Sequence, residues 1–178
     1  MPVSRLTRSP RSDMARLLLG GPSILLAVGG ITVREARPTD FDALLRLLDG
    51  MDESMYAGRG HGAERDVRSL YDRILADPDQ RLLVAEDGGR LVGSAHLMVL
   101  RHFGSSLSRS GLVEGVVVDP AYRRVGVGAA LMRAVAEAAR RAGCYKLALT
   151  SNLARTGAHR FYGRLGWKRS HFGYSLEL

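Results

Sequence analysis

The sequence predicts an α/β protein built on a mixed, largely antiparallel central sheet that is flanked by helices on both faces. Segments that alternate apolar and polar residues, as strands do, are interspersed with segments whose apolar residues recur at helical spacing. Asp87-Gly88-Gly89-Arg90 separates two of the strand-like segments and is typical of a hairpin turn. Because a hairpin joins antiparallel strands, a purely parallel doubly wound sheet does not fit this order of elements.

The first part of the domain predicts one strand and two helices. Ile31 to Ala36 alternates as a half-buried strand does. Pro38-Thr39-Asp40 is typical of a helix start, with Thr39 as a candidate cap, and residues 41–48 supply an apolar helix face. Residues 49–62 are polar and contain glycine, so we expect a mobile loop before a second helix over 64–76.

The remaining part predicts further strands, one long helix and one short helix. After hairpin strands over 81–86 and 91–100, a serine-rich loop over 102–110 leads to the central strand over 111–119. An Ala/Leu-rich segment with helical spacing comes next. The elements predicted after the central strand are a helix over 126–142, a strand over 145–150, a helix over 156–165 and one or two strands over 167–178.

Residues 1–30 differ in composition from the rest of the chain. The apolar stretch from Leu17 to Val28 is interrupted by Gly20-Gly21-Pro22, so it is too short and too broken for a membrane span. A basic start and an apolar middle are shared with export signals, but no A-x-A cleavage site is visible. We therefore expect residues 1–30 to form a poorly ordered extension and residues 31–178 to form one domain.

The chain is strongly basic, with a formal net charge of +8 and a sequence pI of about 10.3. That balance raises the option of nucleic-acid binding, but the arginines are scattered and no basic stripe is interleaved with aromatic residues. We expect neither a nucleic-acid partner nor a membrane partner, and a polyphosphate ligand accounts more simply for a local positive field. The single cysteine, Cys144, excludes an internal disulfide, which favours the reducing cytoplasm.

The most informative stretch runs from Val118 to Leu131 and reads VDPAYRRVGVGAAL. It combines a strand end, a turn that carries Arg123 and Arg124, the glycines of Gly126-x-Gly128, and a helix start. Such a turn points several backbone N–H groups at one place, and the helix dipole adds partial positive charge. We expect a phosphate or pyrophosphate there, although turns of this kind also occur as purely structural corners.

Two known phosphate-binding motifs do not fit this turn. The dinucleotide motif G-x-G-x-x-G needs a third glycine where the chain has Leu131, and the P-loop needs a G-K-[ST] triplet that is absent from the sequence. The remaining pattern, R-x-x-G-x-G from Arg123 to Gly128, resembles the acetyl-CoA motif of the GNAT (Gcn5-related) N-acetyltransferases. Residues 158–167, AHRFYGRLGW, resemble the late A-x-x-F-Y-x-x-x-G-[FW] element of the same family.

The resemblance covers residues 31–178 and implies the GNAT, or acyl-CoA N-acyltransferase, fold. It implies an N-acetyltransferase that moves acetyl from acetyl-CoA to a primary amine of a small molecule by direct attack. No metal is expected, and the five histidines show no metal-binding spacing. Two alternatives stay open: a non-catalytic acyl-CoA-binding sensor on the same fold, and acetylation of a protein or peptide amine.

The resemblance also implies which backbone groups hold the acyl donor. The backbone of Val116, Val117 and Val118 is expected to lie along the pantetheine arm, while their side chains pack as in any strand. A backbone amide in this stretch is expected to polarise the thioester carbonyl, as in an oxyanion hole. The residues expected to hold the pyrophosphate through their amides are Arg123, Arg124, Val125, Gly126, Val127, Gly128 and Ala129.

Two side chains are candidates for proton transfer. Tyr162 matches the family tyrosine that protonates the departing thiolate, and a phenol with a pKa of about 10 suits a thiolate of similar basicity. A buried aromatic anchor is the alternative role for Tyr162. Glu114 lies where family acids remove the amine proton, directly or through water. The alternative for Glu114 is a carboxylate that binds substrate charge or faces solvent.

One departure from the family pattern concerns the position three residues before Ala158. The family often carries asparagine there, whereas this chain has Arg155, and Asn152 lies three residues earlier. Arg155 could reach a phosphate of the acyl donor. Asn152 is the candidate for binding a pantetheine amide.

The acceptor is expected to lie among residues 49–65, residues 102–110 and the C-terminal strands, opposite the acyl donor. The first segment contains several acids, which could hold a cationic polyamine, amino sugar or aminoglycoside, or could simply be solvated. The C-terminal strands, with Tyr174, could line the pocket or pair with a second subunit, so a homodimer is one expectation. The sequence does not name the acceptor.

Overall fold

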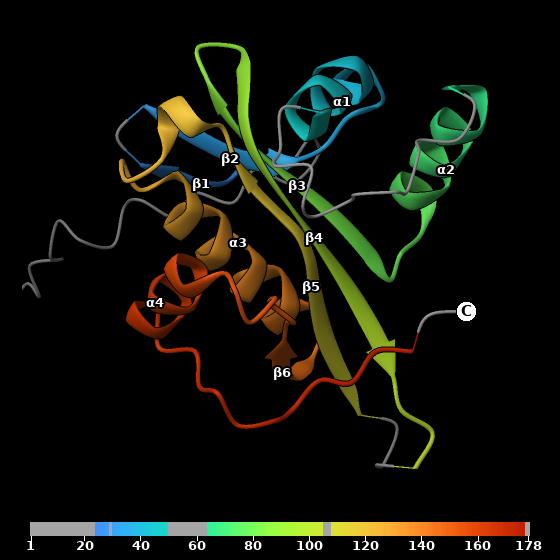
Figure 1. Cartoon of the computed structure of the whole chain (residues 1–178). Coiled ribbons are helices and arrows are strands. Elements are labelled where there is room, and N and C mark those ends of the chain that lie inside the picture. Colours follow the sequence, from blue (N-terminus) through green and yellow to red (C-terminus); the bar gives the residue numbers. More distant parts are fainter. Residues whose placement is uncertain (1–23, 29, 50–63, 105–107, 177–178) are drawn as a thin grey trace, which may run out of the picture.

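The computed structural model describes residues 24–28, 30–49, 64–104 and 108–176. These residues form a six-stranded sheet whose strands lie side by side in chain order (Figure 1). The first five strands pair antiparallel, and the sixth pairs parallel with the fifth, which confirms the predicted mixed, largely antiparallel sheet. The strands are β1 (Ile24–Val28), β2 (Ile31–Glu35), β3 (Gln80–Asp87), β4 (Arg90–Arg101), β5 (Arg109–Val118) and β6 (Cys144–Ala148).

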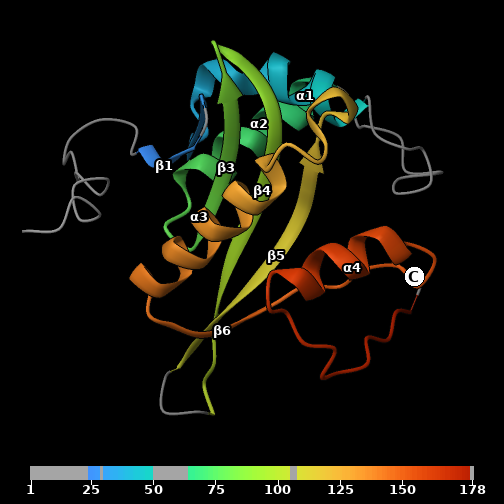
Figure 2. The same cartoon turned by 90° about the vertical axis from the view of Figure 1, so that its left-hand side faces the viewer.

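Helices cover both faces of the sheet, as predicted (Figures 1 and 2). On one face, Phe41, Leu44 and Tyr71 pack against Val84 and Leu91 of the strands. The third helix packs on the opposite face. The helices are α1 (Phe41–Asp49), α2 (Glu64–Ala76), α3 (Val127–Arg141) and α4 (Thr156–Arg164), and short 3-10 turns occupy Pro38–Asp40 and Pro120–Tyr122.

The apolar face of α3 fixes this helix on the sheet. It meets the fully buried Val33, Leu83 and Leu97 of the strands. The spacing of three and four residues is that of an amphipathic helix with one buried face. Because this buried face begins at the first helical residue, the N-terminus of α3 is held firmly beside the end of β5. The buried residues at this spacing are Val127, Ala130, Leu131, Ala134, Val135 and Ala139.

The sheet begins earlier in the chain than the sequence analysis predicts. β1 pairs antiparallel with β2, from Val28 opposite Ile31 to Ile24 opposite Arg34, across a turn in which Gly30 has a φ of +86°. These residues were assigned to the N-terminal extension because glycines break the apolar run before them. Pairing with the open edge of β2 satisfies their backbone groups and makes them a strand. Residues 1–23 lie outside the described residues.

The strands predicted over 167–178 are not formed in the part of this segment that the structure describes. Residues 167–176 have no regular secondary structure, and Phe172, Tyr174 and Leu176 are exposed. Alternation of apolar residues does not suffice for a strand, because the backbone also needs a neighbouring strand to bond with. Within the described sheet, β6 is the last strand and pairs only with β5. A homodimer stays a prediction.

A buried ion-pair network joins the first strand of the predicted domain to the turn before α1. Arg34 is 4% exposed, and its guanidinium donates to both carboxylate oxygens of Asp40, at 2.6 and 2.9 Å, and to Glu86 at 2.7 Å. Burial alone would raise the pKa of Asp40, but hydrogen bonds from Arg34 and the Arg37 amide outweigh it and lower that pKa. The stability that Asp40 contributes is therefore present above the ordinary carboxyl pKa and is lost as pH falls through the lowered value.

Replacing Arg34 by methionine is expected to lower the free energy of unfolding by about 3–5 kcal/mol, because Asp40 would keep a buried charge without its ion-pair partner. Urea denaturation of the variant and the native chain measures the difference. Arg141→Met is the matched control, since it removes an exposed pair with Glu137 that is worth about 1 kcal/mol or less. Equal losses in the two variants would contradict a structural role for the buried network.

Candidate active site

The sheet opens between β5 and β6. The parallel pairing of these strands ends at Leu112 opposite Ala148, whereas β5 continues to pair with β4 as far as Val118. Figure 2 shows β6 and the chain that follows it diverging from β5 towards α4. The edge of β5 from Val113 to Val118 therefore has no strand neighbour on this side among the described residues. An extended ligand could use these backbone groups as an added strand does.

A β-bulge lies in the same part of β5. Glu114 pairs with His96 and Val117 pairs with Ser94, so two residues of β5 lie opposite the single residue Ala95. Gly115, the first of the two, has a φ of +58°, which is a left-handed conformation that favours glycine. Because a bulge bends a strand and increases its twist, it accounts for the divergence of β5 from β6.

The turn between β5 and α3 has an unusual backbone conformation. Arg124 has a φ of +66° and Gly126 a φ of +100°, both left-handed, and Gly126 is the N-cap of α3 without a side chain that could cap it. The first helical bond runs from the Ala130 amide to the Gly126 carbonyl, so α3 supplies no acceptor for the three amides before it. These amides and the helix dipole favour an anion at this end of the helix.

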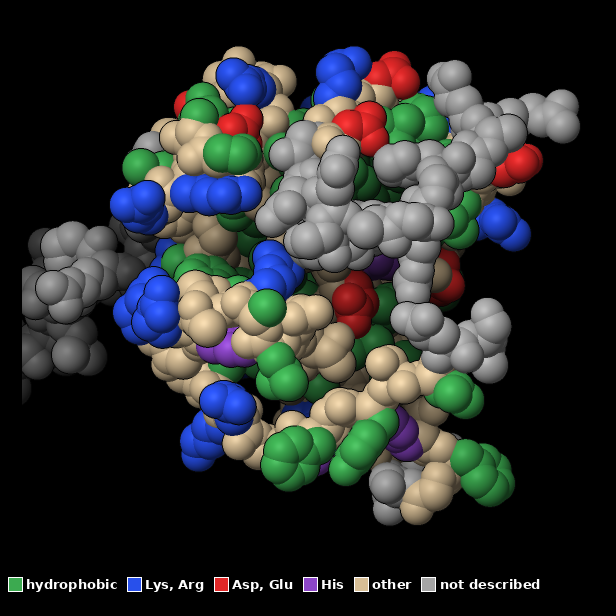
Figure 3. Space-filling view, viewed as in Figure 1, with side chains coloured by type: hydrophobic (Ala, Val, Ile, Leu, Met, Phe, Trp, Pro, Cys, Tyr) green, Lys and Arg blue, Asp and Glu red, His purple; other side chains and the backbone are tan. Residues whose placement is uncertain are grey.

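The charged side chains around the turn also favour an anion. Arg123 and Arg124 are exposed on it. The carboxylate of Asp119, which would repel an anion, accepts hydrogen bonds from the Ala121 amide at 2.9 Å and from Arg90 at 2.8 Å. In Figure 3, Lys and Arg side chains gather on the side of the molecule where Figure 1 shows this turn, α3 and α4. This side of the molecule therefore presents positive charge to a bound anion.

The two sequence motifs meet at Gly128. A Cβ atom at Gly128 would lie 3.1 Å from Cζ of Phe161 and 3.6 Å from Cγ2 of Val118. A side chain here would require Phe161 to shift by a few tenths of an ångström, whereas its contact with Val118 would be ordinary. Close packing against Phe161 thus favours glycine at position 128, and the left-handed backbone favours it at position 126.

Tyr162 is the aromatic residue next to this contact. Its ring packs edge-on against Phe161 and Trp167, with centroids 5.1 and 6.0 Å away. Burial raises the pKa of its phenol, the negative charge of Glu114 raises it further, and the positive charge of Arg155 lowers it. The fold therefore brings the phenol of Tyr162 within electrostatic range of Glu114 on β5 and of Arg155, the residue before α4.

Glu114 lies on β5 immediately before the bulge. Its side chain is exposed, yet partial desolvation by neighbouring atoms raises the pKa of its carboxyl. Its cross-strand partner is His96 on β4, which the sequence analysis did not single out. Strand register would have been the signal for this pairing, but the bulge shifts the register in a way that the sequence does not reveal.

Asn152, the candidate for binding a pantetheine amide, forms hydrogen bonds within its own turn. The side-chain oxygen of Asn152 accepts from the Ala154 amide at 2.9 Å, and its carbonyl lies 3.0 Å from Nε2 of His159, so Asn152 organises the turn before α4. The loop predicted over 49–62 lies almost wholly outside the described residues. In the described ranges, no cluster of side chains is suited to hold a metal ion, and no helix is long and apolar enough to cross a membrane.

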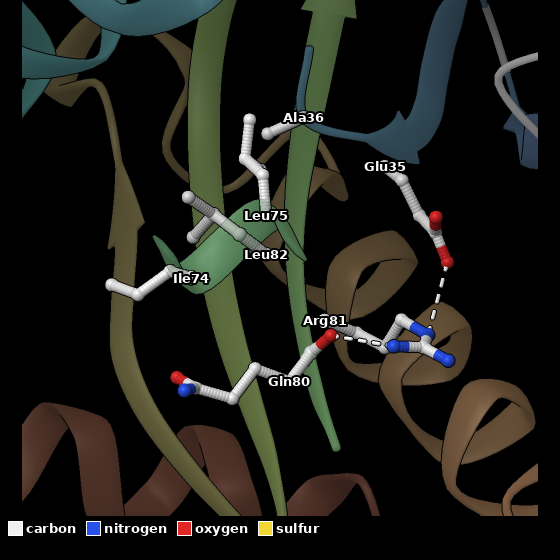
Figure 4. A pocket seen from close by; sticks show the side chains of 7 residues that line it. All are labelled: Glu35, Ala36, Ile74, Leu75, Gln80, Arg81 and Leu82. Carbon is white, nitrogen blue, oxygen red and sulfur yellow. Dashed lines mark hydrogen bonds and ion pairs between the residues drawn. The ribbon is translucent and has the colours of Figure 1, made fainter. Parts of the chain in front are cut away.

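A small pocket lies elsewhere, between β2, β3 and α2 (Figure 4). An ion pair joins β3 to β2 at this pocket, because Arg81 lies 3.4 Å from Glu35. Arg81 also donates to the carbonyl of its neighbour Gln80 at 2.7 Å. The pocket is lined by none of the predicted site residues and by no residue of β5. Its lining consists of Glu35, Ala36, Ile74, Leu75, Gln80, Arg81 and Leu82.

Comparison with known proteins identifies the class. Residues 44–167 match the model of the acetyltransferase (GNAT) family. The chain is 40% identical to a glucosamine 6-phosphate N-acetyltransferase of Trypanosoma brucei brucei, over 51% of this chain and 59% of that protein. It is 35% identical to an aminoalkylphosphonate N-acetyltransferase of Salmonella typhimurium, over 65% of this chain and 76% of that protein.

A solved structure agrees with these sequence matches. A putative acetyltransferase from Agrobacterium tumefaciens is similar to 82% of this chain and 99% of its own, with a TM-score of 0.73 and 25% sequence identity. The chain belongs to the GNAT family of acetyltransferases, whose members use acetyl-CoA as a co-substrate. The resemblance found in the sequence is thereby confirmed.

Proposed function

We propose that this protein transfers the acetyl group of acetyl-CoA to the primary amine of a small molecule by direct attack. The observation that carries the proposal is the contact of the two motifs at Gly128 and Phe161, beside the open edge of β5. This contact supports the proposal that the turn, the free strand backbone and Tyr162 belong to one site.

In the proposed complex, the amides from Arg123 to Ala129 hold the pyrophosphate of acetyl-CoA. The free edge over Val116–Val118 accepts the pantetheine arm as an added strand, and one of its amides polarises the thioester carbonyl. The side chain of Val117 meanwhile stays buried in the core. Ligand binding by backbone and packing by side chains are therefore compatible on this strand.

The proposed reaction removes two protons from the acceptor's nitrogen and delivers one to the departing sulfur. Glu114 takes a proton from the acceptor's ammonium group, and the raised pKa of its carboxyl suits it to that role. The amine nitrogen then attacks the thioester carbon, a tetrahedral intermediate forms, and its collapse breaks the carbon–sulfur bond. Tyr162 gives its phenolic proton to the departing thiolate, and the resulting phenolate takes the second proton from the nitrogen, which leaves a neutral amide and a neutral phenol. The raised pKa keeps that phenol protonated at neutral pH before the reaction.

Charge supports an acceptor that carries a phosphate or phosphonate. Residues 140–176 contain eight Lys and Arg residues and no acid. The two relatives described above are named for a sugar phosphate and for aminoalkylphosphonates. We therefore rank small amines with a phosphate or phosphonate group above cationic amines.

The proposal is tested by measuring thiol release from acetyl-CoA with glucosamine 6-phosphate, 2-aminoethylphosphonate, kanamycin and spermidine. We expect turnover with at least one amine and a preference for the two anionic ones. A preference for spermidine or kanamycin would contradict the acceptor class but not the acetyl transfer. Binding of CoA with background thiol release on every amine would favour the sensor alternative instead.

Replacing Tyr162 by phenylalanine is expected to lower kcat by about 10²- to 10⁴-fold, because the thiolate would leave without its proton. The packing against Phe161 and Trp167 would stay, so the KM for acetyl-CoA and the melting temperature should be unchanged. Steady-state kinetics measure both constants. Tyr145→Phe, at a tyrosine that is 63% exposed and has no proposed role, serves as the control. An unchanged kcat would leave Tyr162 only the role of an aromatic anchor.

A further inference from the structure

His96 lies beside Glu114 at the point where β5 bulges. The two residues are directly opposite each other on antiparallel strands, so their side chains stand on the same face of the sheet, with Cβ atoms about 5 Å apart. That face is also the face on which α1 and α2 pack. On the other side of His96, β3 places Leu82, an apolar neighbour. Glu114 is thus the charged residue next to His96 in the sheet.

The imidazole of His96 has an unsatisfied nitrogen. Its Nε2 atom is buried and has no hydrogen-bond partner among the described residues. A buried polar atom without a partner destabilises a fold, so a sequence selected for stability alone would place an apolar side chain here. The unpartnered nitrogen, on the residue paired across the strands with Glu114, therefore points to a partner that reaches it when the atoms covering it move aside.

The charge state of His96 suits its imidazole to accept a hydrogen bond. Burial lowers the pKa of its imidazole, so the ring is neutral at neutral pH. A neutral imidazole with its proton on Nδ1 has a lone pair on Nε2 and can accept one hydrogen bond. An ammonium group has three N–H donors, enough for Nε2 of His96 and the carboxylate of Glu114 at once.

We propose that Nε2 of His96 accepts a hydrogen bond from the acceptor's amino group and holds that group against Glu114. This inference rests on the proposed acetyl transfer. One N–H bond of the ammonium breaks as its proton passes to the Glu114 carboxylate, where an O–H bond forms. The amine keeps its hydrogen bond to His96, which directs the freed lone pair towards the thioester. His96 is therefore a residue that binds and orients the acceptor, and it exchanges no proton itself.

The test uses His96→Leu, His96→Gln and His96→Asn in the full chain, with the best amine of the four-amine panel. His96→Leu should raise the amine KM by about 10- to 100-fold, the usual effect of losing one hydrogen bond to a charged group. The KM for acetyl-CoA should not change, and the melting temperature should stay the same or rise, since an unpartnered buried nitrogen is removed. If His96 had only a structural role, its replacement would not raise the KM for the amine while leaving the KM for acetyl-CoA unchanged.

The two amide variants distinguish the nitrogen atoms. The amide of glutamine reaches the place of Nε2, whereas that of asparagine reaches only the place of Nδ1. We therefore expect His96→Gln to recover most of the amine affinity and His96→Asn to recover little. This pair decides the question even if His96→Leu fails to fold. Met98→Leu, two residues further along the same face of β4, is the control and should leave both KM values unchanged.

The outcomes separate this inference from the proposed function. Turnover by the native chain together with an unchanged amine KM in His96→Leu would overturn the role of His96 alone. Equal activity of the glutamine and asparagine variants would also overturn it. Absence of turnover by the native chain on every amine would contradict the acetyl transfer, and the role of His96 with it.

Discussion

Replacing Glu114 by glutamine is expected to lower kcat/KM for the amine by about 10²- to 10⁴-fold, because no base would remain to take the proton of the ammonium group. Glutamine has nearly the same shape and stays opposite His96, so the fold and the KM for acetyl-CoA should be retained. Steady-state kinetics with the best amine of the panel measure the loss. Glu137→Gln, on the exposed face of α3, is the control and should behave as the native chain does.

The pH dependence gives a second measurement of the same role. The carboxyl of Glu114 must be ionised to act as a base, so kcat/KM of the native chain should rise with pH through its pKa. Desolvation raises that pKa above the ordinary value, so this rise should lie above the usual carboxyl range. The glutamine variant should lack it and keep only the rise that the amine itself causes at higher pH. A native profile without this lower rise would exclude Glu114 as the base.

Replacing Gly126 by glutamate is expected to raise the dissociation constant of CoA by about 10³-fold. A carboxylate about 4 Å from one phosphate charge costs about 4 kcal/mol at an effective dielectric constant of about 20. Space does not limit the substitution, because no atom lies within 4 Å of a Cβ built at this position. Isothermal titration calorimetry with CoA measures the change.

The φ of +100° at Gly126 requires a matched control, since any side chain is strained there. Gly126→Ala carries the same strain, about 1–2 kcal/mol, but no charge. We expect the alanine variant to bind CoA far more tightly than the glutamate variant, and the gap to narrow at high salt. Equal dissociation constants for the two variants would show that the turn does not hold the phosphates.

The sequence predicted the regular elements from local patterns. The Val116–Val118 run, the glycines after it and the Ala/Leu spacing from Val127 onward each reflect interactions within a few residues, and the structure has the strand, turn and helix there. Elements that depend on partners distant in the chain are harder to predict from the sequence. β1 is a strand because β2 lies next to it, and the alternating segment after Trp167 forms no strand in its described part because none of the described strands pairs with it.

The candidate site shows the same division. Arg123 to Ala129, Glu114 and Tyr162 were found as motif positions, whose chemistry depends on residue type and spacing. His96 was not found, because its position opposite Glu114 depends on the register of β4 and β5 across a bulge. A change of register by one residue turns every side chain of a strand to the other face, and no local pattern encodes that choice.

The sequence by itself thus determined the family, the order of most elements and the turn whose amides favour an anion. Only the tertiary structure decided that Gly128 lets α3 approach Phe161, that the edge of β5 is open beyond Leu112, and that the charges of Glu114 and Arg155 act on the phenol of Tyr162. The physical reason is the separation along the chain over which each interaction acts. Helical spacing and turn chemistry act between neighbours in the chain, whereas close packing and electrostatic coupling arise between residues that only the folded sheet brings together.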